Sequence, residues 1–259
     1  MGFVENSSGF ALALFAGILL TMEVGRWIGA VVLAREGGRD VKGAGTAEGA
    51  VIGLLGLLIA FTFSGAATRF EERRHLITQE ANAIGTAYLR IDLLANEAQG
   101  PMRDLFRRYL DNRLETYRDV NDTAKTTLKL AEGVVLQNEI WTKAVAALHA
   151  PSVSPQAGIL LLPALNAMID ITATRLVATR NHPPAIIFIL LGALSLVAAL
   201  LAGYSMAANK VRSWLHQIVF ATMMAVTLYV VLDLEFPRKG MIRIDSADLI
   251  LKELRASMK

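Results

Sequence analysis

Two pairs of charged side chains lie in or beside long apolar stretches, where a charge calls for a specific explanation. Glu23 and Arg26 are three residues apart inside the otherwise uncharged run 10–33. On a helix this spacing puts both side chains on one face, where they could neutralise each other. A charge at the centre of a bilayer costs roughly 2.5–3.5 kcal/mol on insertion scales, so such residues usually face protein or water. The pair therefore indicates either a permeation element or a structural link to a neighbouring helix.

The second pair, Asp233 and Glu235, follows the apolar run 214–232 and precedes "FPRKGMIRID". Carboxylates at a membrane exit can bind a hard cation such as calcium, but a calcium site usually recruits about six to eight oxygen ligands. Two carboxylates fall short of that number, and a solvated helix end is the favoured interpretation. The histidines show no ligand spacing, so we expect no metal and no cofactor. They are His75, His149, His182 and His216.

Four segments have the length and composition of membrane-spanning helices. Crossing a hydrocarbon core about 30 Å thick takes roughly 17 to 25 apolar residues. The segments are Phe10–Leu33, Gly49–Thr68, Pro184–Ala208 and Trp214–Leu232. Of the whole chain, 54% of residues are hydrophobic and 19% are charged, and the charges are concentrated elsewhere. We therefore expect an all-α polytopic protein, with membrane hairpins at 1–68 and 184–235, a helical insert at 69–183 and a tail at 236–259.

The second span has no proline at its end and is expected to continue as one helix into the insert. Beyond it the apolar residues recur at alternating steps of four and three, which indicates a helix with one packed face. This stripe runs through Phe70, Ile77, Ala81, Ile84, Tyr88 and Ile91. The same stripe could be covered by the insert itself or by a partner protein.

Three further helices are expected in the insert. Pro101 suits a first helical turn and is expected to open the first of them. The next should cover Thr123–His149, and the last contains "LLPALNAMIDITATRL" and ends before the double proline of "NHPP". In the middle helix the side chains predicted to point inward are Leu128, Val135, Trp141, Val145 and Leu148.

Two faces of the second span carry different residue types. Small residues at steps of three and four allow close contact between helices in lipid. They are Gly49, Gly53, Gly56 and Ala60. A second face could form an apolar constriction if the helix lines a pore, because such a ring gates by dewetting. Its members are Leu54, Leu58, Phe61 and Gly65, and an ordinary buried stripe would look the same.

Basic residues near the span ends suggest an orientation. An even number of spans puts both termini and the insert on one side. That side carries Arg69, Arg73, Arg74, Arg175, Arg180, Arg238, Lys239 and Arg243. The opposite loops carry Arg35, Arg39, Lys42, Lys210 and Arg212. Because basic residues favour the cytoplasmic side, this predicts a cytoplasmic insert and cytoplasmic termini in the inner (plasma) membrane.

Covalent chemistry and nucleic-acid binding find no support in the residues. The chain has no cysteine, and therefore no disulfide and no thiolate nucleophile or ligand. We find no nucleophile elbow, phosphate-binding loop or zinc-protease motif, so the protein is not expected to be an enzyme. The net charge of +3 comes without a basic motif interleaved with aromatic residues, so no nucleic-acid partner is expected.

Three stretches carry a family resemblance: "LLIAFTFSGAATRFEERRHLITQEANAIGTAYLR", "LLPALNAMIDITATR" and "LDLEFPRKGMIRID". Together they are similar to blocks of a bacterial family of bestrophin-like membrane proteins, over about 49–244. The first block also resembles the bestrophin anion channels, in which a long second helix leaves the membrane and forms an apolar neck around a fivefold axis. The resemblance implies a homo-oligomer that conducts small inorganic ions, and five is the number of subunits it suggests.

Carried over residue by residue, the resemblance makes Leu58 and Phe61 candidates for the neck and puts a basic vestibule just beyond it. The vestibule candidates are Arg69, Arg73 and Arg74. A basic vestibule would concentrate anions. The stretch "FTFSGAATRF" lacks the Asn-rich part and the second aromatic residue of bacterial bestrophins. The acidic calcium clasp of the animal channels is reduced to Asp233 and Glu235, which argues against calcium gating.

Three function hypotheses follow. The leading one is an oligomeric, anion-conducting channel with an apolar constriction on the second helix and lipid and ions as its partners. The second is a membrane-anchored interaction or sensory protein whose insert binds a cytosolic protein. The third, a transporter, has less support because the spans contain no discontinuous, symmetry-related helices.

Overall fold

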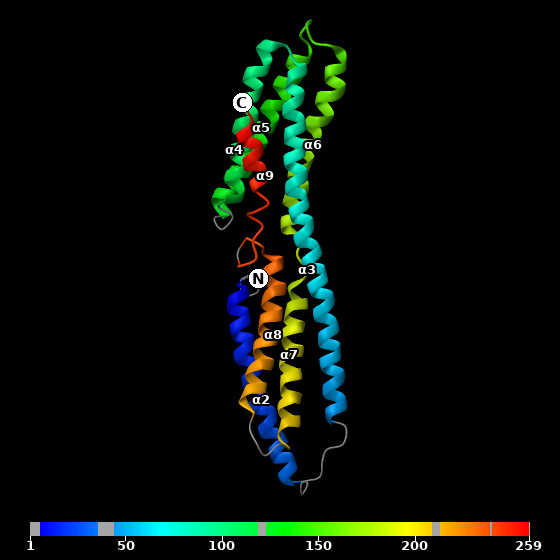
Figure 1. Cartoon of the computed structure of the whole chain (residues 1–259), viewed down its shortest axis with the longest axis vertical. Helices are drawn as coiled ribbons and strands as arrows, with labels where there is room; N and C mark the ends of the chain where they lie inside the picture. The colour runs from blue at the N-terminus through cyan, green and yellow to red at the C-terminus, as the bar shows by residue number, and fades with distance from the viewer. Residues whose placement is uncertain (1–5, 36–43, 119–122, 209–212, 239, 259) are drawn as a thin grey trace. The chain divides into compact units, whose positions relative to one another are not determined.

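The protein is helical throughout the part of the chain that the structure, a computed structural model, describes: residues 6–35, 44–118, 123–208, 213–238 and 240–258. The α-helices are labelled in Figure 1. They are α2 (Ser7–Arg35), α3 (Ala44–Leu89), a 3-10 helix η1 (Arg90–Leu93), α4 (Asn96–Arg118), α5 (Thr123–Leu148), α6 (Pro155–Arg180), α7 (Ala185–Met206), α8 (Trp214–Glu235) and α9 (Leu249–Ser257). The all-α prediction is confirmed.

The chain divides into two compact units. The membrane unit comprises Met1–Phe70 and His182–Ile242, and the insert unit comprises Glu71–Asn181 and Arg243–Lys259. Helix α3 runs from Ala44 to Leu89 as one element, so the unbroken second helix predicted from the sequence is confirmed. Five basic residues used to predict the orientation lie outside the described residues: Arg39, Lys42, Lys210, Arg212 and Lys239.

Four helical stretches are long and apolar enough to cross a membrane, and the four predicted spans fall on them. The stretches are Ser7–Arg35, Gly45–Leu93, Pro155–Met206 and Trp214–Glu235. Within the third of these, the predicted span corresponds to α7. Each helix satisfies its own backbone hydrogen bonds, which is the condition for an open chain to cross hydrocarbon.

The core of the membrane unit is built mainly by α2, α7 and α8, which lie side by side (Figure 1). Ile18 and Met22 on α2 are buried together with Ala198 on α7 and Leu228 on α8. Helices α2 and α7 approach closely at glycines, because small residues let backbones come together in lipid. A Cβ added at Gly203 would overlap the carbonyl oxygen of Met22.

This close approach gives a direct test of the helix packing. We expect Gly203→Ala to lower the stability of the membrane unit by about 1–3 kcal/mol, because backbone atoms of α2 would have to move. Gly192→Ala on the same helix is the matched control, since its added Cβ would lie 3.5 Å from the ring of Phe10, an ordinary contact. Thermal unfolding of the purified protein in detergent should show a lower midpoint for Gly203→Ala alone. Equal midpoints for the two variants would contradict this packing.

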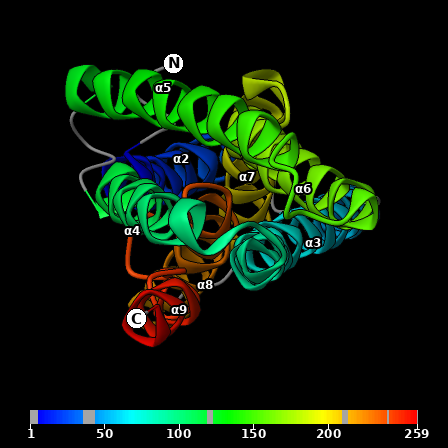
Figure 2. The ribbon, with the colours of Figure 1, turned by 90° about the horizontal axis from the view of Figure 1, so that it is seen from above.

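The insert unit is a bundle formed by the second half of α3 with α4, α5 and α6, which Figure 2 shows from above. The predicted stripe of α3 and η1 is largely buried in it: Ile77, Ile84 and Ile91 are fully buried and Ala81 nearly so. Tyr88 of the same stripe packs edge-on against Phe106 of α4, with ring centroids 5.9 Å apart. The insert itself covers the stripe that the interaction hypothesis left open for a partner protein.

The predicted start of α4 at Pro101 is wrong. The helix begins at Asn96, and Pro101 lies inside it. A proline at this position removes the hydrogen bond to the carbonyl of Glu97, which is an exposed residue whose carbonyl water can solvate. The side-chain amide of Gln99 donates to the carbonyl of Leu94 at 2.9 Å and joins the new helix to the turn before it.

The predicted inner face of α5 is also wrong. Leu128 and Val135 are 70% and 64% exposed, while Trp141, Val145 and Leu148 are half-buried. The buried face is formed by Leu136, Gln137, Ile140 and Ala144. It includes a polar residue that an apolar-stripe prediction rejects, although Gln137 has hydrogen-bond partners inside the bundle.

The C-terminal helix α9 packs against α4 in the insert unit. Leu251 is buried, and the guanidinium of Arg255 donates to both carboxylate oxygens of Asp111, at 2.7 and 3.0 Å. These hydrogen bonds to Asp111 raise the pKa of Arg255 above its ordinary value. The predicted tail therefore contains an ordered, docked helix.

Candidate functional site

The membrane part of α3 contacts its own unit along one face. Leu55 and Ala66 are buried, and Ile59 packs against the same core. In the most apolar 18-residue stretch of α3, 11% of the residues are buried inside the chain. The corresponding stretches of the other three candidate spans have 28%, 39% and 33% of their residues buried. Most of the surface of this span is therefore left for lipid or for other chains.

The predicted constriction face lies beside that packed face. Phe61 is 68% exposed and Leu54 is 49% exposed, while Leu58 and Gly65 are half-buried. With 3.6 residues per turn, these four positions share one face of the helix. Leu58 packs partly on the core of its own unit, so the face runs from the edge of the core to open surface.

The small-residue face of α3 is open. A Cβ added at Gly49, Gly53 or Gly56 would meet no atom within 4 Å. All three glycines and Ala60 are exposed. The close helix contact that these residues permit is therefore not made by the described part of the same chain.

Of the three predicted vestibule arginines, Arg69 is held by a buried carboxylate of its own unit. Its Nε donates to Oε1 of Glu235 at 2.7 Å, and its Nη2 donates to the same oxygen. Glu235 is fully buried at the end of α8, and its Oε2 lies 3.4 Å from Nδ1 of His182. The His182 ring stacks on Phe236, with ring centroids 4.6 Å apart. The ion pair ties the end of the membrane part of α3 to the end of α8.

The other two arginines belong to the insert unit and differ in exposure. Arg73 is 5% exposed and donates to the carbonyl oxygens of Ala178 and Asn181, at 3.1 and 3.0 Å. It therefore satisfies carbonyls at the end of α6. Arg74 is an exposed side chain that pairs with Glu71 one turn earlier, at 2.9 Å. Among the three, Arg74 is the one that presents its charge to solvent most openly.

Asp233 and Glu235 do not form the solvated helix end that the sequence favoured, because they are 1% and 0% exposed. Asp233 accepts a hydrogen bond from the backbone amide of Ile242 at 2.7 Å and a longer one from the Ser7 hydroxyl at 3.4 Å. A Cβ added at Gly240 would overlap Oδ1 of Asp233, so the returning chain needs glycine there. The carboxylate holds the segment after α8 against the helix end.

The two carboxylates therefore bind different partners: protein hydrogen-bond donors at Asp233, and a guanidinium with an imidazole at Glu235. A calcium ion needs several carboxylate or carbonyl oxygens directed at one point. No group of three or more His, Cys, Asp or Glu side chains that could hold a metal occurs among the described residues. The residues present do not fit a calcium clasp.

Glu23 accepts a hydrogen bond within the membrane unit from α8. The Nε2 of Gln217 donates to Oε1 of Glu23 at 3.1 Å, and Gln217 is 1% exposed. Arg26 is half-buried on the same helix as Glu23. The charge pair between Glu23 and Arg26 stays a prediction.

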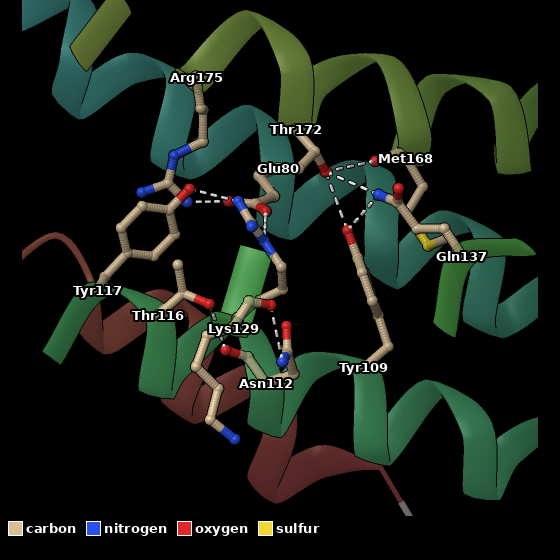
Figure 3. Close-up of polar contacts among 11 residues, drawn as sticks. Glu80, Tyr109, Asn112, Thr116, Tyr117, Lys129, Gln137, Met168, Thr172 and Arg175 are labelled. Atoms are coloured by element: carbon tan, nitrogen blue, oxygen red, sulfur yellow. Dashed lines mark hydrogen bonds and ion pairs between the residues drawn. The ribbon is translucent and has the colours of Figure 1, made fainter. Parts of the chain in front are cut away.

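The insert unit contains a buried ionic cluster, shown in Figure 3, in which Glu80 of α3 accepts from two arginines. Arg113 of α4 donates through Nε to Oε1 at 2.6 Å, and Arg175 of α6 donates through Nη1 to Oε2. The three side chains are between 0% and 4% exposed. The Tyr117 ring lies against both guanidiniums, with its centroid 3.9 Å from Cζ of Arg175 and 4.8 Å from that of Arg113. The cluster joins three helices at one carboxylate.

A second polar group in the same bundle joins α4, α5 and α6 (Figure 3). The amide of Gln137 donates to the Tyr109 hydroxyl at 2.9 Å and to Oγ1 of Thr172 at 3.1 Å. The two hydroxyls lie 2.9 Å apart. Buried networks of this kind specify one register of packing, because any shift leaves polar groups without partners.

The ionic cluster was not predicted from the sequence, although the sequence contains a signal for it. Glu80 and Arg175 belong to two of the three stretches quoted for the family resemblance, and Arg69 and Glu235 join the first stretch to the third. A pairing of opposite charges between the quoted stretches would have indicated both contacts. Arg113 lies outside these stretches and had no such signal.

The helical fold, the four candidate spans and the buried polar contacts at their ends define the chain as a multi-pass membrane protein with lipid-facing helices. A bestrophin-like domain is matched over residues 17–249, and the chain therefore belongs to the bestrophin-like family. No curated protein and no solved structure matches the chain.

Proposed function

We propose that the chain forms a homo-oligomeric ion channel in the inner membrane, with α3 of each subunit around a central pore. The carrying observation is the open surface of α3, which exposes Phe61 and Leu54 on one face and three glycines on another. The bestrophin-like family supports an oligomer of this kind, and the resemblance to bestrophin channels implies five subunits.

The two open faces of α3 carry different residue types and can serve different purposes in a ring. If the glycine face of one subunit packs against a different surface of its neighbour, the contact is head-to-tail, and it forms a closed ring when the rotation between subunits closes. The glycine face can accept a neighbouring helix closely, because nothing of its own chain occupies it. The face with Leu54 and Phe61 would then be free to line the axis.

An apolar ring at Leu54, Leu58 and Phe61 would act as the constriction. A narrow pore without polar groups excludes water and ions until it widens, so such a ring can open and close the path without charged side chains. The ion pair between Arg69 and Glu235 lies about one turn after Gly65 on α3 and would hold the helix in position.

The permeant ions of the proposed channel are anions, concentrated by the predicted basic vestibule. Arg74 carries most of this proposal, because its side chain is the most exposed of the three, although it also pairs with Glu71. Arg69 and Arg73 are less exposed and bind Glu235 and backbone carbonyls, respectively. The insert and both termini are proposed to face the cytoplasm, following the distribution of basic residues near the spans.

Reconstituted protein tests the function. Liposomes that contain the purified protein should release a trapped halide faster than liposomes without it. Bilayer recordings in asymmetric salt should give a reversal potential close to the equilibrium potential of the anion. The detergent-solubilised protein should have the mass of an oligomer. A monomer without flux in any salt would contradict the channel. A reversal potential close to the equilibrium potential of the cation would contradict only the anion preference.

A further inference from the structure

Arg26 carries a charge inside the first membrane span, and the described part of the chain supplies no acceptor for it. The side chain is half-buried and makes no hydrogen bond or ion pair with the described residues. The buried nitrogen and oxygen atoms without a partner do not include those of Arg26, so its guanidinium reaches the surface of the membrane unit. Because a charge surrounded by hydrocarbon is costly, the guanidinium calls for an anionic or polar partner.

Arg26 lies where the neighbouring helices of the membrane unit end. A Cβ added at Gly29, one turn after Arg26, would lie 2.7 Å from the carbonyl oxygen of Tyr204 in the last turn of α7. In the first turn of α8, Gln217 donates to Glu23, which lies one turn before Arg26. Arg26 is therefore level with the end of α7 and the start of α8.

The same level carries residues that are typical of a membrane–water boundary. Trp27 follows Arg26 and is 69% exposed, and Trp214 is the first residue of α8 and is 50% exposed. Exposed tryptophans are enriched at this boundary. Near the start of α3 and the end of α7, Glu48 accepts a hydrogen bond from Ser205. Long arginine side chains near the end of a span extend to the headgroups, so the guanidinium of Arg26 is within reach of them.

We propose that Arg26 binds the phosphate of an anionic phospholipid headgroup. A guanidinium presents paired N–H donors that match two oxygens of a phosphate, which makes the contact both charged and geometrically specific. The two nearby carboxylates have protein donors of their own, Gln217 for Glu23 and Ser205 for Glu48. The site belongs to the membrane unit and does not rest on the proposed channel.

An apolar stripe on the face of α2 that carries Arg26 indicates that the phosphate belongs to a lipid. Leu12, Phe15 and Leu19 precede Arg26 at steps of three, four and seven, so the four side chains share one face of the helix. Leu12 is 72% exposed, and Phe15 and Leu19 are half-buried against the core. An acyl chain that covers this stripe would lie in the span with its phosphate at Arg26. A free phosphate would bury none of this apolar surface.

Lipid binding to the purified full-length protein in a nonionic detergent tests the site. Native mass spectrometry with added phosphatidylglycerol should show a lipid-bound wild type. Arg26→Gln should bind this lipid about fivefold more weakly, the factor expected when one basic residue near a headgroup is lost. Arg26→Lys keeps the charge without the paired donors and should lie between the two.

Arg35→Gln is the matched control, because Arg35 is an exposed arginine at the end of the same helix. This variant should bind phosphatidylglycerol as the wild type does. Equal binding of the lipid by the wild type and Arg26→Gln would overturn the proposal.

Thermal unfolding gives a second readout and separates a lipid from a free anion. Phosphatidylglycerol should raise the unfolding midpoints of the wild type and Arg35→Gln more than that of Arg26→Gln, because a ligand of the folded state stabilises it. Inorganic phosphate should give no increase that depends on Arg26, and such an increase would overturn the lipid site in favour of a free anion. If Arg26→Gln lowered the midpoint without lipid and kept the full increase with lipid, the predicted pairing with Glu23 would replace the lipid site.

Discussion

Glu80→Ala is expected to lower the free energy of unfolding of the insert unit by about 3–5 kcal/mol, the range found when one partner of a buried ion pair is removed. The change leaves the guanidiniums of Arg113 and Arg175 buried without their shared carboxylate. It also removes the group that joins α3, α4 and α6. Denaturant titration of the full chain, followed by circular dichroism and limited proteolysis within 71–181, would measure the loss.

Glu71→Ala is the matched control, because Glu71 is an exposed glutamate on the same helix and also pairs with an arginine. An exposed ion pair contributes about 0–1 kcal/mol, so this variant should unfold close to the wild type. The stability of Glu80→Gln should lie between those of the two alanine variants, because glutamine keeps the shape of the side chain and loses its charge. Equal stability of Glu80→Ala and Glu71→Ala would show that the cluster does not hold the bundle together.

Phe61→Ala is expected to raise the ion flux through reconstituted protein. In the proposed pore Phe61 narrows an apolar ring, and a smaller side chain lets water into the constriction. Lowering the barrier by about 1.4 kcal/mol would raise the rate about tenfold. Halide efflux from liposomes at equal protein content would measure the change.

Phe63→Ala is the control for this prediction. Phe63 is also exposed on α3, at 44%, but two residues of helix turn it about 200° away from Phe61. A side chain that faces lipid should not limit permeation, so its flux should stay near that of the wild type. If both alanine variants behaved alike, the constriction could not lie on the Phe61 face.

The main helices could be predicted from the sequence because their apolar periodicity is long and regular. The stripe through Ile77 and Ile84 is buried as predicted, and the span before it continues into the same helix. The prediction failed in α5, where the buried face contains Gln137 and leaves Leu128 exposed. A prediction from apolar periodicity assigns apolar residues to the buried face. It therefore cannot anticipate a glutamine that is buried because it donates hydrogen bonds to Tyr109 and Thr172.

The polar contacts were harder to predict, because they depend on which segments meet. Asp233 and Glu235 resembled a solvated helix end in the sequence, and their burial follows from the return of the chain at Ile242 and from Arg69 of a distant helix. The constriction face could be chosen from spacing and resemblance. The sequence could not show that α3 would be the least covered span of its own chain.

Cysteine accessibility along α3 tests the central claim most directly, and the chain suits the method because it contains no native cysteine. Phe61→Cys and Phe63→Cys would be reconstituted in planar bilayers and exposed to a charged, water-soluble thiol reagent during current recording. If α3 lines the pore, the reagent should change the current through Phe61→Cys irreversibly and leave Phe63→Cys unaffected. If the reagent changed the current through Phe63→Cys alone, or through neither variant, a pore lined by this face of α3 would be contradicted.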